Sequence, residues 1–198
     1  FLAARPKERP FCYWFGSRQP HRPYASGTGM KSGIDPSKVS VPPYLPDNET
    51  TRRDICDHLQ QIEQFDRQCA EILNLLERSG ELDNTLIVVT GDNGWPFPRA
   101  KATCYDSGTH QLLAIRWGAR IKGGTVAEDL VSLSDLAPTF LEVAGVTVPA
   151  SMTGRSLMPI LVSGKSGAID PSRDHVLTGM ERHVQNGRSD GDNRSVGY

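Results

Sequence analysis

The sequence predicts an α/β protein in which a mostly parallel sheet is flanked by helices, and of which this chain carries an incomplete part. Three observations support this fold class. Strand-like runs alternate with helical patterns along the chain. Residues 85–90 form a β-branched run that is apolar at consecutive positions, as expected of a parallel strand covered on both faces. Asp92 and Asn93 follow at the carboxyl end of that run, where such sheets place their sites.

The balance of charges excludes two classes of partner. The 198 residues carry 22 basic and 23 acidic side chains, which gives a formal net charge of -1. Such a balance provides no long-range attraction to nucleic acid or to an anionic membrane surface. No apolar run approaches the roughly 20 residues that cross a bilayer. We therefore expect no nucleic-acid partner and no membrane span.

The first quarter of the chain predicts one short strand and two loops. Phe11–Phe15 is an aromatic, apolar run between a proline and a glycine, which is typical of a buried strand. Prolines and a glycine make Gly16–Tyr24 a loop. Residues 25–47 are rich in Gly, Ser and Pro, and a loop of that length inside a domain is either functional or disordered.

A long helix is predicted over Glu49–Arg78. Its apolar residues recur at steps of three and four, so they form one stripe along the helix. Gly80 stands where such a helix would end. The predicted stripe consists of Ile55, Leu59, Ile62, Phe65, Cys69, Ile72, Leu73 and Leu76.

The remaining elements continue the alternation. Leu112–Trp117 reads as a second strand, and Val131–Ala144 reads as a helix with Ser134 as its N-cap. The tail from Ser163 is polar and glycine-rich, with one strand-like patch at His175–Thr178.

Polar residues in two of the loops are candidates for a site. Asp92 and Asn93 offer adjacent oxygen ligands, which suit calcium or magnesium better than zinc. His21 and Lys101 offer donors and positive charge suited to an oxyanion such as sulfate or phosphate. A metal with cationic side chains neutralises the charge of a transferring sulfuryl or phosphoryl group. Each residue alone also fits an ordinary turn or a solvated surface position, so the prediction depends on their joint occurrence in this order.

Five segments stand in order along the sequence: Pro20–Tyr24, Thr85–Gly94, Lys101–Gly108, Ser132–Thr139 with Ala144–Gly145, and Thr153–Leu157. Together they resemble the sulfatase family of the alkaline phosphatase superfamily, roughly over residues 10–161, and Asp92–Pro98 favours the heparan N-sulfatase (sulfamidase) branch. The resemblance implies an alkaline phosphatase-like fold. Residues 1–162 would form a partial catalytic domain, and residues 163–198 a polar tail leading toward a C-terminal subdomain. In this resemblance the first three segments correspond to the family's histidine loop, metal-ligand strand and lysine segment, and the last two to its later structural signatures.

The resemblance also implies a role for each candidate residue. Asp92 and Asn93 would be ligands of one divalent cation, usually Ca²⁺. Lys101 would contact the sulfate oxygens and the region of the nucleophile. His21 would contact the sulfate and help to protonate the leaving group.

The family's nucleophile has no counterpart in this chain. In the family, a formylglycine made from Cys or Ser in the motif Cys/Ser-x-Pro-x-Arg attacks sulfur as its hydrate. The nearest approximation is Ile169–Arg173, and Ile169 cannot be oxidised to an aldehyde. The other cation ligands, and a lysine–histidine pair near the nucleophile, belong before Phe1 in family order. His110 stands where the family often has Arg and receives no role. We therefore expect a fragment that lacks its nucleophile and is inactive alone.

The function that the resemblance implies is a sulfuric ester or sulfamate hydrolase acting on a sulfated small molecule or glycan, in a periplasmic or secreted location. One alternative is a phosphodiesterase or phosphonate hydrolase of the same superfamily, but these usually carry His where this chain has Asn93. Another is a non-catalytic protein that binds sulfated glycans, if the full-length protein lacks the nucleophile motif. His183 is a further candidate for substrate contact, beside the simpler interpretation of a solvated charged segment.

Overall fold

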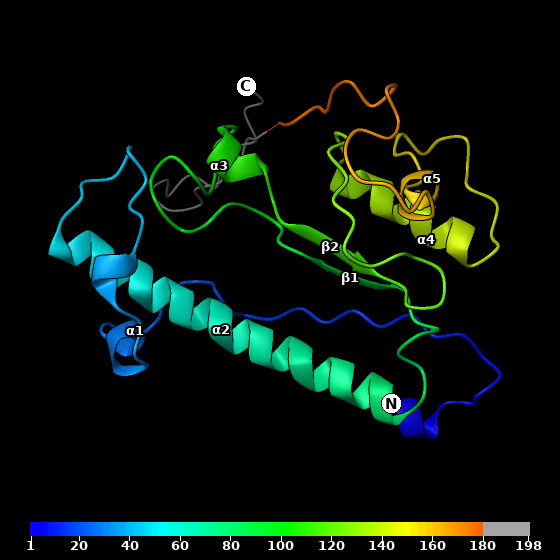
Figure 1. The fold of residues 1–198 in the computed structure, drawn as a ribbon, viewed down its shortest axis with the longest axis horizontal. Coiled ribbons are helices and arrows are strands. Elements are labelled where there is room, and N and C mark those ends of the chain that lie inside the picture. The colour runs from blue at the N-terminus through cyan, green and yellow to red at the C-terminus, as the bar shows by residue number, and fades with distance from the viewer. Residues whose placement is uncertain (180–198) are drawn as a thin grey trace, which may run out of the picture. The chain divides into compact units, whose positions relative to one another are not determined.

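The computed structural model describes residues 1–179, which divide into two compact units (Figure 1). Unit 1 consists of Phe1–Leu82 and Asn93–His110, and unit 2 consists of Asp83–Asp92 and the described residues from Gln111 onward. The elements of unit 1 are η1 (Leu2–Ala4), α1 (Thr28–Lys31), η2 (Pro36–Lys38), α2 (Glu49–Arg78) and α3 (Asp106–Thr109). Those of unit 2 are β1 (Ile87–Thr90), β2 (Leu113–Arg116), η3 (Leu133–Asp135), α4 (Leu136–Val143) and α5 (Met158–Leu161).

Helix α2 has the bounds that the sequence predicts. The side chain of Asn48 caps its first turn by accepting a hydrogen bond from the backbone N–H of Thr51 at 2.9 Å. Beyond its last residue, Gly80 adopts a φ of +74°, a conformation that glycine enters at little cost and that commonly ends a helix. Among residues 1–179, no helix is both long and apolar enough to cross a membrane.

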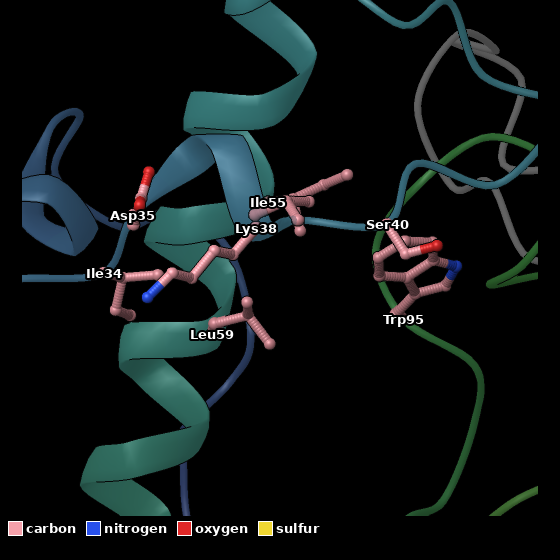
Figure 2. Close-up of a pocket in the computed structure, with 8 residues that line it drawn as sticks. Ile34, Asp35, Lys38, Ser40, Ile55, Leu59 and Trp95 are labelled. Atoms are coloured by element: carbon pink, nitrogen blue, oxygen red, sulfur yellow. The ribbon is translucent and has the colours of Figure 1, made fainter.

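The segment between residues 25 and 47 is ordered by helix α2. It contains α1 and η2, and Ile34 and Lys38 lie across from Leu59 of α2 (Figure 2). A buried carboxylate, Asp57, accepts hydrogen bonds from the backbone N–H groups of Gly27 at 2.8 Å and Gly29 at 2.7 Å. A Cβ atom on Gly29 would lie 2.2 Å from the carbonyl oxygen of Cys56, so only glycine permits this approach. The predicted loop is therefore a structured segment that packs on α2.

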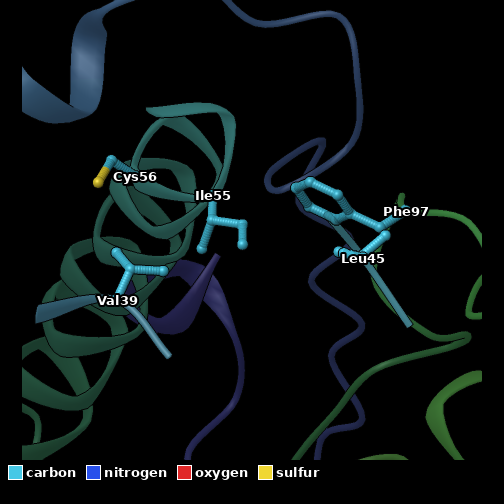
Figure 3. Packing of buried hydrophobic residues seen from close by; sticks show 5 residues of the cluster. All are labelled: Val39, Leu45, Ile55, Cys56 and Phe97. Atoms are coloured by element: carbon cyan, nitrogen blue, oxygen red, sulfur yellow. The ribbon is translucent and has the colours of Figure 1, made fainter. Parts of the chain in front are cut away.

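The core of unit 1 gathers around the first half of α2. The cluster consists of Val39, Leu45, Ile55, Cys56 and Phe97, which come from three separate stretches of the chain (Figure 3). The middle of the predicted apolar stripe is not buried among the described residues, since Leu59 and Ile62 are 36% and 40% exposed.

The predicted strand at Phe11–Phe15 is wrong. The structure has an extended segment there without strand pairing, and this segment runs beside α2 (Figure 1). The ring of Phe15 stacks on that of Phe65 at 6.4 Å between centroids, and Ser17 donates to the side chain of Gln68 at 2.9 Å. An apolar run becomes a strand only where a neighbouring strand takes up its backbone hydrogen bonds. Within the described chain, this segment meets a helix instead.

The two predicted strands form and pair antiparallel with each other, whereas the sequence predicts a mostly parallel sheet. Strands β1 and β2 make a two-stranded antiparallel sheet, with Ile87 opposite Arg116 and Thr90 opposite Leu113. The prediction of a mostly parallel sheet is therefore not met by residues 1–179. Antiparallel neighbours need no crossover helix between them, whereas parallel neighbours do. The patch at His175–Thr178 also forms no strand.

The predicted helix over residues 131–144 consists of η3 followed by α4. Its start is set by Ser132 rather than by the predicted cap, Ser134. The hydroxyl of Ser132 accepts from the backbone N–H of Ser134 at 3.4 Å, and the carboxylate of Asp135 accepts from the backbone N–H of Ser132 at 3.1 Å. This reciprocal arrangement is a capping box, and it places the helix start two residues before Ser134.

A buried ion pair organises unit 2 around Asp135. Arg173 Nη1 donates to Asp135 Oδ2 at 2.7 Å, and only 3% and 7% of the two side chains are exposed. Arg173 Nη2 also donates to the carbonyl oxygens of Arg155 and Ser156, both at 3.0 Å. Burial alone would raise the pKa of Asp135, but hydrogen bonds from backbone N–H groups and from Arg173 outweigh it and lower that pKa. The arginine of the segment Ile169–Arg173 is thus a structural residue.

Candidate functional site

The predicted site residues fall on both sides of the division between the units. His21, Asn93 and Lys101 belong to unit 1, and Asp92 belongs to unit 2, although it precedes Asn93 in the chain. His21 and Asp92 are exposed, while Asn93 and Lys101 are half-buried. His183 lies outside the described residues.

Lys101 sits on a loop that closes on itself between residues 94 and 108. The backbone N–H of Gly94 donates to the carbonyl oxygen of Gly108 at 3.0 Å, and that of Lys101 donates to the carbonyl oxygen of Trp95 at 3.1 Å. A Cβ atom on Gly94 would lie 2.2 Å from the carbonyl oxygen of Ser107, so the closure requires glycine at this position. The loop therefore holds the backbone of Lys101 through contacts that do not involve its ammonium group.

The residues on either side of this lysine adopt an unfavourable backbone. Arg99 and Ala102 both have a φ of +61°, in the left-handed region that costs non-glycine residues of order 1 kcal/mol or more. The hydroxyl of Ser107 donates to the carbonyl oxygen of Arg99 at 2.5 Å, and Ala100 is completely buried. Strain of this kind persists where the surrounding structure imposes it, and it is common at functional sites.

The histidine loop is shaped by a turn before His21 and a contact after it. The backbone N–H of His21 donates to the carbonyl oxygen of Arg18 at 2.8 Å. Its ring Nδ1 lies against the carbonyl oxygen of Arg22. A carbonyl oxygen can only accept, so Nδ1 carries the proton, and Nε2 remains for another partner.

The loop that carries His21 contacts the loop of residues 94–108, which carries Lys101, through Arg22. Arg22 Nε donates to the carbonyl oxygen of Pro96 at 3.1 Å, and its Nη2 donates to Asp54 Oδ2 on α2 at 2.6 Å. The sequence interpretation assigned no role to Arg22. The signal that could have found it is the spacing of Asp54, Asp57 and His58, which lie three and four residues apart and so share one face of a helix.

A buried histidine lies between these loops. His58 is 3% exposed, and its ring lies 6.3 Å from that of Tyr24, 6.0 Å from that of Trp95 and 5.8 Å from that of Phe97, between centroids. Burial, and to a lesser extent the positive charge of Arg22, lower the pKa of His58 to about 4, against a smaller opposing effect of Asp54. The imidazole is therefore neutral at physiological pH.

This buried imidazole predicts a loss of stability in mild acid. In the unfolded chain, His58 takes up a proton near pH 6.5, whereas in the folded protein it does so only near pH 4. As pH falls between these values the unfolded state binds more protons, so unfolding becomes easier by about 3 kcal/mol in total. We expect urea unfolding of the full-length protein to show this loss, and His58→Phe to remove that part of the pH dependence. Equal slopes in wild type and variant would contradict the prediction.

Asp92 and Asn93 have the donor types that calcium prefers, but they are too few to hold it alone. Ca²⁺ takes about 6–8 oxygen ligands, and carboxylate and amide oxygens are among them. Within residues 1–179, no three His, Cys, Asp or Glu side chains gather closely enough to hold a metal ion. These two residues can therefore supply only part of a cation site.

A shallow groove of about 380 Å³ lies along α2, apart from the predicted residues (Figure 2). Its walls are mostly apolar, with the ring of Trp95 at one end and the side chain of Lys38 near the other. None of His21, Asn93 and Lys101 lines it. The groove is therefore not the predicted anion site.

Comparison with known protein families finds one matching family model. It is that of the sulfatases, and it covers residues 1–146. The human N-sulphoglucosamine sulphohydrolase is 31% identical over 179 residues, which cover 80% of this chain and 33% of that protein. An ulvan-active sulfatase from Formosa agariphila is 35% identical over 122 residues, which cover 62% of this chain and 20% of that protein. The chain thus matches a third or less of the length of these relatives.

Two solved structures have a similar fold. A protein solved in complex with its substrate D-glucosamine-2-N,6-O-disulfate matches with a TM-score of 0.58 and 30% identity, over 69% of this chain and 28% of that one. A phosphonate monoester hydrolase from Silicibacter pomeroyi matches with a TM-score of 0.53 and 29% identity, over 70% of this chain and 28% of that one. Each likeness covers only part of the solved chain, which agrees with an incomplete α/β domain.

Proposed function

Because the chain belongs to the sulfatase family, we propose that the full-length protein hydrolyses a sulfate ester or sulfamate of a sulfated sugar. The sulfated sugar is supported by two similar proteins, one named as an N-sulphoglucosamine sulphohydrolase and one solved with a disulfated glucosamine. Hydrolysis of phosphate or phosphonate esters is less well supported, because Asn93 stands where such enzymes usually carry His.

Two donors of unit 1 act on the sulfate group in this proposal. The ammonium of Lys101 binds sulfate oxygens and offsets their negative charge, which would otherwise repel an attacking nucleophile. His21, with its Nδ1–H engaged by the Arg22 carbonyl, acts in its imidazolium form, in which Nε2 also carries a proton; Nε2–H faces the sulfate and gives that proton to the leaving group, which leaves the neutral imidazole. The observation that carries the proposal is the Arg22–Pro96 hydrogen bond, which joins the two loops that bear these donors.

The remaining chemistry needs groups that this chain does not contribute alone. Asp92 and Asn93 would hold a Ca²⁺ ion together with ligands from elsewhere in the protein, and such an ion adds positive charge beside the sulfate. Formylglycine supplies the family's covalent nucleophile. The sequence of this chain contains no Cys or Ser in the required motif, so that residue would lie outside it.

The proposal is tested by the substrate preference and cation dependence of the full-length protein. We expect release of sulfate from N-sulfoglucosamine or an aryl sulfate, with phosphonate monoesters at least about tenfold slower in kcat/KM. A chelator should lower the rate, and added Ca²⁺ should restore it, because the ion neutralises charge at the reacting group. Faster cleavage of the phosphonate would favour the alternative hydrolase. A lack of turnover on every ester and sulfamate, with binding of sulfated glycans retained, would show a non-catalytic protein.

A further inference from the structure

The side chain of Arg22 contacts two other segments of unit 1 and a ring of its own loop. Its Nη2 donates to Asp54 Oδ2 on α2 at 2.6 Å, and its Nε donates to the carbonyl oxygen of Pro96 at 3.1 Å. The guanidinium also lies over the rings of Tyr24 and Phe97, 4.7 and 4.9 Å from their centroids. Ion pairing with Asp54 raises the pKa of Arg22, so the group stays charged at any pH of interest.

These contacts restrain His21 because Arg22 is its neighbour in the chain. The residue is bonded to His21 by one peptide, and its carbonyl oxygen receives the contact from the His21 ring. The guanidinium is anchored to α2, a helix of 30 residues whose first half contributes to the core of the unit. Any shift of the histidine backbone would therefore strain a charge-assisted hydrogen bond, which is roughly twice as strong as a neutral one.

The side chain of Arg22 also restrains Lys101, through the backbone of residues 95 and 96. Pro96, whose carbonyl oxygen accepts from Arg22, directly follows Trp95, and the carbonyl oxygen of Trp95 accepts the backbone N–H of Lys101 at 3.1 Å. Of these two consecutive carbonyl groups, that of Trp95 accepts from the backbone of Lys101 and that of Pro96 accepts from the side chain of Arg22. One guanidinium connects the loop of His21 with the loop of Lys101.

We propose that Arg22 is a positioning residue, which fixes the loops of His21 and Lys101 relative to each other so that both side chains reach one sulfate group. This inference rests on the proposed hydrolase function and adds a specific structural requirement to it. The planar guanidinium serves Asp54 and Pro96 at once. A lysine at this position could pair with Asp54 as a point charge, but it has no Nε donor at the right place for Pro96.

The experiment compares Arg22→Lys with Arg52→Lys in the full-length protein. Arg52 is a matched control because it, too, pairs with a carboxylate, that of Asp47, and donates to backbone carbonyl groups, in its case those of Pro36 and Val39, both at 2.9 Å. These hydrogen bonds of Arg52 involve no residue of the two site loops, 18–24 and 94–108. We expect Arg22→Lys to lower kcat for a sulfated substrate by about 10- to 100-fold with little change in KM, because the loss is one of alignment. Arg52→Lys should keep the wild-type kcat.

Hydrogen–deuterium exchange supplies a readout that does not depend on activity. Arg22→Lys should speed exchange in residues 94–101 as well as in residues 18–24, whereas Arg52→Lys should speed it only around residues 36–39. Asp54→Asn keeps an acceptor for Nη2 and leaves the Pro96 contact in place, so it should lose less activity than Arg22→Lys. Wild-type kcat in Arg22→Lys, or unchanged exchange in residues 94–101, would overturn the inference. If the wild-type protein releases no sulfate, the proposed function fails, and the exchange data still decide whether Arg22 links the loops.

Discussion

Replacing Asp135 with alanine is expected to lower the free energy of unfolding by about 3–5 kcal/mol, because it leaves the charge of Arg173 buried without its partner. The carboxylate also accepts hydrogen bonds from the backbone N–H groups of Arg155 at 2.8 Å and Ser132 at 3.1 Å, so the substitution removes a helix cap as well. Urea unfolding of the full-length protein, followed by a probe in unit 2, measures this loss.

Two further variants separate the buried charge from general effects of truncation. Arg67→Ala removes an exposed ion pair with Glu63, 4.0 Å apart, and should cost less than about 0.5 kcal/mol. The double variant Asp135→Leu with Arg173→Met should recover part of the loss, because no charge then remains buried without a partner. A loss below about 1 kcal/mol for Asp135→Ala would show that water reaches the pair.

The sequence predicts helix α2 to the residue because every signal for it is local. The two signals behind the prediction, a stripe of apolar residues and a glycine after the last turn, lie within one continuous stretch, Ile55–Gly80, and the structure adds the cap at Asn48. Helical hydrogen bonds also join residues four positions apart, so the element needs no distant partner to be recognised.

The sheet and the first predicted strand were harder to predict for the opposite reason. Whether Phe11–Phe15 pairs, and in which direction β1 and β2 run relative to each other, depends on segments far away in the sequence. An apolar run shows only that a segment avoids water. Phe15 meets that requirement by stacking on Phe65 of a helix.

The site residues stay predictions from the sequence, which missed the arginine whose hydrogen bond joins the two loops. His21, Asn93 and Lys101 stood out because their chemistry suits an anion or a cation. Arg22 did not, since a charged residue in a loop is ordinarily solvated. Its role depends on Asp54 of α2, which only the fold brings beside it.

Replacing Lys101 with alanine is expected to lower kcat/KM for a sulfated substrate by about 10²- to 10³-fold, the usual loss when one charged donor is removed from a reacting group. The melting temperature should change by less than about 2 °C. Activity should fall without a loss of stability because the loop is shaped by hydrogen bonds to the carbonyl oxygens of Trp95, Gly108 and Arg99. The backbone N–H of residue 101 makes its hydrogen bond in the wild type and in the alanine variant alike.

A control variant, and measurements at different salt concentrations, show whether Lys101 contacts the sulfate directly or acts only through the net charge of the protein. Lys31→Ala removes an exposed lysine from α1 in the same unit and should leave kcat/KM unchanged, so a general effect of net charge would reveal itself there. Added salt should weaken such a general effect strongly and a direct contact much less. Equal losses in both variants, or a fall in melting temperature that accompanies the fall in activity, would mean that Lys101 supports the loop and does not bind the reacting group.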